Sequence, residues 1–132
     1  MATDYVIDTS LRLVRTTPSG HVTAAEIGDL RRRLLADAAF DPTFSQLIDA
    51  SAVTKLDMGA PATDTIRALA QQYLFAPRSR QAIVVSAPHD LGLFRMFQTY
   101  RELAGGQEDI HICTTMEEAL VWLESPPPSA VA

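Results

Sequence analysis

The sequence predicts an α/β fold with a single mixed, mostly parallel sheet of about five strands and four helices, in the order ββαβαβαβα. Apolar residues recur with a period of two in some segments and at helical spacing in others, and the two kinds of segment alternate along the chain. The run Ala82–Val85 is apolar without interruption, which is typical of a strand covered on both faces. Because parallel strands need crossover connections, the alternation favours right-handed βαβ units.

The first third of the chain predicts a hairpin followed by a helix. Asp4–Asp8 and Leu11–Thr17 have strand-like patterns and are separated by a short polar turn. We expect their inward-facing side chains to be Val6, Leu11 and Leu13, with Val14 as a further candidate. Pro18–Gly20 predicts another turn. The capping-box pattern Thr23–Glu26 then predicts the start of a helix that ends near Asp37.

The rest of the chain alternates between strands and helices up to a proline-rich tail. Strands are predicted over Phe44–Ala50, Ala82–Val85 and Ile110–Cys113, and helices over Asp64–Phe75, His89–Ala104 and Met116–Leu123. Residues 1–125 should form one domain, and 126–132 should be a flexible Pro-rich tail.

Composition limits the classes of function. The chain has 132 residues, of which 47% are hydrophobic and 20% charged, as in an ordinary globular domain. Eleven basic and sixteen acidic residues give a net charge of −5, which argues against a nucleic acid partner because the phosphate backbone is also negative. No segment is apolar enough to span a membrane, and we expect a cytoplasmic protein.

The sequence contains no recognisable catalytic or metal-binding motif. It has no glycine-rich phosphate loop with a lysine and no nucleophile elbow. The three histidines share no helical ligand spacing, and the lone cysteine, Cys113, is interpreted as a core residue. We therefore expect no enzymatic activity, no cofactor and no metal site. An enzyme would require Asp49 and Asp57 to act as a carboxylate pair.

The segment Leu47–Gly59 is the most informative stretch of the sequence. It predicts a buried strand with Asp49 at its carboxyl end, then a loop that carries Asp57 just ahead of the next helix. Open α/β folds usually place their working residues at this edge of the sheet. The commoner use of such carboxylates is to accept backbone N–H groups of a turn, and Lys55 could pair with either of them.

These residues resemble the signature of the STAS domain, which is named for sulfate transporters and anti-sigma-factor antagonists. Leu47–Ser51 is similar to the family's strand-end aspartate, small residue and serine, and Asp57–Ala60 falls where the antagonists have an aspartate, two serines and a glycine. The element order and later segments of the chain are similar to uncharacterised bacterial SpoIIAA-like stand-alone proteins. The residues that match the signature are Asp49, Ser51, Asp57 and Gly59.

The resemblance implies a regulatory protein-interaction module without the usual phosphorylation switch. In the antagonists the phosphorylated serine corresponds to Gly59, which has no hydroxyl group. Whether Ser51, Thr54 or Thr63 is phosphorylated instead stays open.

The predicted helix His89–Ala104 has more large apolar side chains than a narrow core-facing stripe needs. The candidates for interface or ligand contact are Phe94, Met96, Phe97 and Tyr100. One hypothesis is a non-enzymatic STAS-like module that binds a regulatory protein or a second copy of itself as a homodimer. The alternative is a small apolar, lipid-like ligand bound between the sheet and this helix. A third interpretation is that the helix is simply buried in the core.

Overall fold

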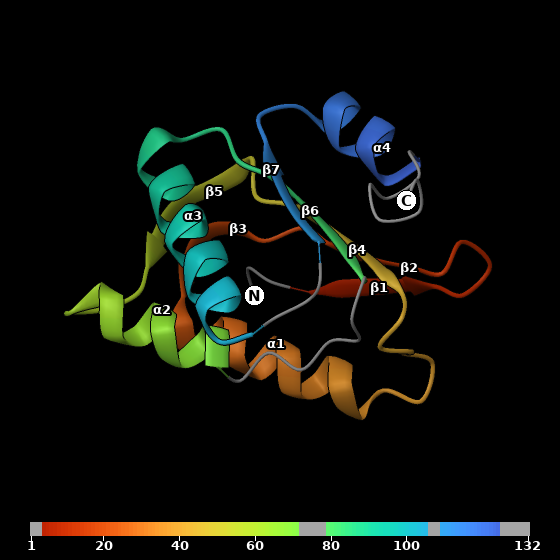
Figure 1. The fold of residues 1–132 in the computed structure, drawn as a ribbon, viewed down its shortest axis with the longest axis horizontal. Coiled ribbons are helices and arrows are strands. Elements are labelled where there is room, and N and C mark those ends of the chain that lie inside the picture. The colour runs from red at the N-terminus through yellow and green to blue at the C-terminus, as the bar shows by residue number, and fades with distance from the viewer. Residues whose placement is uncertain (1–3, 72–78, 106–108, 125–132) are drawn as a thin grey trace.

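The computed structural model describes residues 4–71, 79–105 and 109–124. The elements in chain order are β1 (Tyr5–Asp8), β2 (Leu13–Thr16), β3 (Ser19–Thr23), α1 (Ala24–Ala36), β4 (Ser45–Asp49), β5 (Ala52–Asp57), α2 (Ala62–Gln71), β6 (Arg80–Val84), α3 (Pro88–Leu103), β7 (Asp109–Cys113) and α4 (Met116–Glu124). Figure 1 shows their arrangement.

A five-stranded sheet forms the centre of the molecule, with the strand order β1-β2-β4-β6-β7. β1 pairs antiparallel with β2, and the remaining pairs are parallel. Helices α1, α2 and α3 lie on one side of this sheet and α4 lies on the other (Figure 1). The prediction of a mixed, mostly parallel sheet with four helices is therefore confirmed.

Side chains of the inner strands alternate between two hydrophobic layers, as strand geometry requires. Every residue of β6 is buried, which confirms the double coverage expected of the apolar run. Ala82 and Val84 of this strand pack in the α4 layer together with Leu47 of β4. Ile83, between them in the chain, points into the space between the sheet and α1–α3.

A second, two-stranded sheet was not predicted. It pairs β3 with β5 in parallel, with a register irregularity between Gly20 and His21. Both segments were expected to be turn or loop, because neither has the unbroken apolar run of a core strand; the structure buries only some of their side chains. Their pairing partners lie more than 30 residues apart, and local sequence patterns do not report such contacts.

The hairpin itself is confirmed, but two of its predicted inward positions are wrong. Val6 is 67% exposed because it lies on the edge strand β1, and Leu11 is exposed because it lies in the turn between the strands. Leu13 and Val14 are both buried, and they face opposite layers of the molecule.

The helix ends follow local capping chemistry. The Thr23 hydroxyl accepts a hydrogen bond from the backbone N–H of Glu26 at 3.3 Å, which confirms the predicted start of α1. The Thr115 hydroxyl accepts from the N–H of Glu118 at 3.2 Å, at the start of α4. α3 ends just before Gly105, whose φ is +85°. The predicted helix end at Phe75 and the tail at 126–132 lie outside the described residues.

Adjacent leucines of α1 give a test of this packing. Leu34 is 2% exposed and packs with Val14 and Phe44, whereas Leu35 is 47% exposed. We expect Leu34→Ala to lower the free energy of unfolding by about 2–5 kcal/mol, since it leaves a cavity in the core. Leu35→Ala, the control, should change it by less than about 0.5 kcal/mol. Urea denaturation measures both, and equal losses would contradict the assigned helix face.

Candidate functional site

The first half of the predicted signature forms a turn between β4 and β5. The Asp49 carboxylate accepts hydrogen bonds from the backbone N–H of Ser51 at 3.1 Å and from its hydroxyl at 2.6 Å. The Ser86 hydroxyl, at the end of the neighbouring β6, donates to the Ser51 carbonyl at 3.2 Å. Asp49 therefore holds the backbone of the turn, which is a frequent use of aspartate at such positions.

The second half of the signature forms a turn at the end of β5. The Asp57 carboxylate accepts from the backbone N–H of Gly59 at 3.0 Å and lies 3.1 Å from Nε2 of His21. These two contacts, the Gly59 N–H first, hold the pKa of Asp57 below its usual value. Gly59 has a φ of +73°, in the left-handed region that favours glycine.

The two aspartates lie at opposite ends of β5. Asp49 precedes the first residue of this six-residue strand and Asp57 is its last, and at about 3.3 Å per residue the strand is roughly 17 Å long. The structure therefore does not bring Asp49 and Asp57 together as a carboxylate pair. The partner of Asp57 is His21 of β3, which the sequence did not suggest.

The predicted contact residues of α3 face the interior of the molecule. Phe97 is buried, and Phe94, Met96 and Tyr100 are partly buried against the same core cluster. Phe94 and Phe97 also line a cavity between the five-stranded sheet and the α1–α3 side. The structure thus places two of the four candidates at a pocket in the location that the ligand-binding hypothesis expected.

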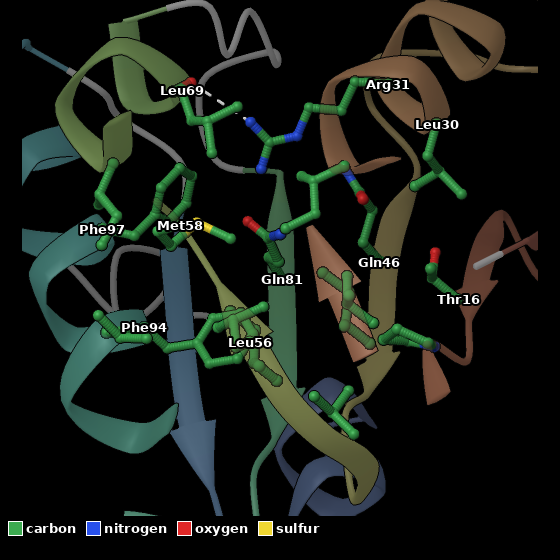
Figure 2. A pocket seen from close by; sticks show the side chains of 18 of the residues that line it. Thr16, Leu30, Arg31, Gln46, Leu56, Met58, Leu69, Gln81, Phe94 and Phe97 are labelled. Carbon is green, nitrogen blue, oxygen red and sulfur yellow. Dashed lines mark hydrogen bonds between the residues drawn. The ribbon is translucent and has the colours of Figure 1, made fainter. Parts of the chain in front are cut away.

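The cavity has a volume of about 90 Å³ and walls that are mostly apolar (Figure 2). Interiors of proteins rarely contain voids larger than a water molecule, so a space of this size is a distinctive feature. The apolar side chains around it come from α1, β4, β5, α2, β6 and α3, and include Leu30, Leu56, Met58, Leu69, Phe94 and Phe97.

Polar side chains of three neighbouring strands form the floor of the cavity. Thr16 of β2, Gln46 of β4 and Gln81 of β6 are all buried and line it. Gln46 and Gln81 are directly opposite each other in the parallel register. Within the part of the chain that the structure describes, the Gln46 amide makes no hydrogen bond to another residue, and the residue is 5% exposed. Because Gln46 lines the cavity, its amide can hydrogen-bond a polar group that enters this space.

Arg31 of α1 places a positive charge at the rim of the cavity (Figure 2). Its guanidinium donates to the carbonyl oxygen of Leu69 at 3.3 Å and lies 5.1 Å from the centre of the Phe97 ring. These contacts bridge α1, α2 and α3, and they hold the charge beside an apolar interior. Arg31 was not among the residues predicted from the sequence to contact a ligand.

A second group of side chains lies in the other layer, between β7 and α4. One ligand-type atom each of His111, Cys113 and Glu118 lies within 4.8 Å of the others. Burial and the nearby Glu118 carboxylate raise the pKa of the Cys113 thiol. The sequence search missed this group because it considered only helical histidine spacing. The available signal was a His-x-Cys pair on one face of a strand, followed by an acidic helix start.

Among the described residues, no helix is both long and apolar enough to cross a membrane. No model of a known protein family matches the sequence, and no curated protein does. Among solved structures, the chain is similar to an uncharacterised protein of the DUF3478 family with a SpoIIAA-like fold, from Shewanella loihica PV-4. It is 18% identical, covers 84% of this chain and 83% of its own, and gives a TM-score of 0.53. This chain therefore has a SpoIIAA-like fold, as the sequence resemblance implied.

Two glycines give a paired test of the turn after β5. Gly59→Ala should lower the free energy of unfolding by about 1–2 kcal/mol because the φ of +73° is unfavourable for any side chain. Gly92→Ala, within α3 and with open space around its α-carbon, should raise it by about 0.5–1 kcal/mol. Urea denaturation of both variants provides the measurement. A Gly59 variant as stable as the wild type would mean that the turn does not require glycine.

Proposed function

We propose that this protein is a non-enzymatic binding protein for a small apolar ligand with a carboxylate or similar polar head. The observation that carries the proposal is the cavity in front of the sheet, whose apolar walls surround the Gln46 amide, which makes no hydrogen bond to another described residue. Pockets of this kind, apolar with a few converging polar groups, are typical of small-molecule sites.

The size of the cavity limits the ligand. At about 90 Å³ it is smaller than the engineered apolar cavity of about 150 Å³ that accommodates benzene. A single aliphatic chain, partly inserted, suits this space better than a lipid with two chains. The walls supply apolar contact along its length, from Leu30 of α1 to Phe94 of α3.

The polar groups favour an acidic head. The Arg31 guanidinium at the rim can pair with a carboxylate, and the interaction is strong where the surroundings exclude water. The chain as a whole is negatively charged, with a net charge of −5, so general electrostatic attraction does not supply this preference. Arg31 is the local feature that would select an acid.

A series of straight-chain acids from hexanoate to decanoate tests the proposal by isothermal titration calorimetry. We expect affinity to rise about fourfold with each added methylene, from burial of about 0.8 kcal/mol per group, and to level off once the cavity is filled. Arg31→Gln should weaken binding of the acids about ten- to a hundredfold, through loss of a charged hydrogen bond. The matching alcohols should bind Arg31→Gln and wild type alike.

The adjacent Arg32 supplies the control. Its side chain is exposed and forms an ion pair with Asp29 on the surface of α1, so Arg32→Gln should bind the acids as the wild type does. Gln46→Leu should weaken binding about two- to tenfold. Absence of binding to the wild type across the whole acid series, with the fold intact by circular dichroism, would rule the proposal out.

A protein-interaction role is the second candidate, and the observation that favours it is the edge of the sheet. β1 is an outer strand of the described sheet, and its Val6 side chain is 67% exposed. An open edge can pair with another strand, and two copies of β1 would pair around a twofold axis. The partner would then be a second copy of this chain, in a regulatory module without the phosphorylated serine.

Light scattering at increasing protein concentration tests this second candidate. If β1 forms the contact, Val6→Lys should convert a homodimer into a monomer, because an edge lysine opposes strand addition. Val121→Lys on α4, at a residue that is similarly exposed at 64%, should leave the dimer unchanged. A wild-type protein that stays monomeric at all concentrations would exclude the dimer.

A further inference from the structure

We propose that His111, Cys113 and Glu118 bind a zinc ion between β7 and α4. The three side chains offer one imidazole nitrogen, one sulfur and one carboxylate oxygen, and these atoms all lie within 4.8 Å of one another. This site is independent of the cavity, because it lies in the α4 layer on the other face of the sheet.

The backbone positions the three ligands. His111 and Cys113 are two residues apart in β7, so their side chains project from the same face of the strand. Cys113 is the last residue of that strand, at the carboxyl edge of the sheet, where α/β folds commonly place their sites. Glu118 lies in the first turn of α4, which the Thr115 cap fixes relative to the end of β7.

The histidine ring is held in place without using its nitrogens. It stacks on the Trp122 ring with 5.0 Å between centroids and 18° between planes. Within the described residues, the imidazole has no hydrogen-bond partner, although the side chain is partly buried. Stacking therefore orients the ring and leaves its nitrogen close to a thiol and a carboxylate. Such a ring can act as a metal ligand.

The donor set selects the kind of metal. Thiolate and imidazole together favour zinc and related transition metals over magnesium or calcium, which prefer oxygen ligands. With bonds of about 2.0–2.3 Å in a tetrahedron, neighbouring ligand atoms would lie about 3.3–3.8 Å apart. The ligand atoms therefore need to approach by about an ångström, and rotation of the exposed Glu118 side chain can supply its part of this movement. Three protein ligands leave the fourth position to water.

A zinc ion at this site would link strand to helix. Because it would bind only the folded arrangement, it would stabilise the native state. The thiolate and carboxylate charges would balance those of the ion, so no unpaired charge would stay at the buried end of the site.

The experiment uses tag-free, reduced, full-length protein that has been treated with a chelator and desalted. Titration with Co²⁺ should produce the near-ultraviolet thiolate charge-transfer band and the visible bands of a tetrahedral site, and Zn²⁺ should displace both. Zn²⁺ should also raise Tm. Cys113→Ser should abolish the charge-transfer band, and Glu118→Gln should weaken Zn²⁺ affinity at least tenfold.

Neighbouring residues supply the controls. Glu117→Gln changes an exposed carboxylate next in sequence, and His89→Gln removes an exposed imidazole at the start of α3, on the other side of the sheet from α4, so both variants should bind Zn²⁺ as the wild type does. Glu118→Gln alters an exposed side chain, so its result holds even if Cys113→Ser fails to fold. The proposal is wrong if the wild type gives no thiolate band with excess Co²⁺, or if Glu118→Gln and wild type bind Zn²⁺ with equal affinity.

Discussion

The burial of both faces of the inner parallel strands is the constraint on which the rest of the structure depends. β4 and β6 lie inside the sheet, so each must send alternate side chains into two separate layers. One layer, under α4, contains the closely packed Leu47 and Ala82. The other, facing α1–α3, contains the cavity. Each of these strands thus contributes to two layers that share its backbone and none of its side chains.

The elements that could be predicted from the sequence are those specified by interactions between residues close together in the chain. The Thr23 cap, the apolar run of β6 and the glycine after α3 each reflect a local requirement of hydrogen bonding or burial. The β3–β5 sheet has no such local signal. Its strands are polar and partly exposed, and each is specified by a partner distant in sequence. Which side chains of the hairpin face the core also depends on the neighbouring strands. No local pattern shows that Val6 lies on an edge strand.

The candidate site was predictable only in part for a related reason. Phe94 and Phe97 stood out because α3 carries surplus apolar side chains, and they do line the cavity. Gln46 and Gln81 did not stand out, since a glutamine in a strand is ordinary until its register places it beside another over a void. The same holds for Cys113, whose ligand-like neighbours come from the strand and from the following helix. Candidate residues were expected at the carboxyl end of β4, and the group around Cys113 lies at the carboxyl end of β7.

The binding proposal depends on the polar floor of the cavity. Gln46 and Gln81 lie side by side on the cavity face of β4 and β6, whereas the opposite face carries Leu47 and Ala82. Arg80 of β6 is also buried, with its guanidinium against the aromatic ring of α4, so buried polar side chains occur on both faces of the sheet. What distinguishes the two glutamines is that they line a space. Polar groups among apolar walls orient a small molecule in a binding site, so the proposal rests on the position of these glutamines and not on their burial.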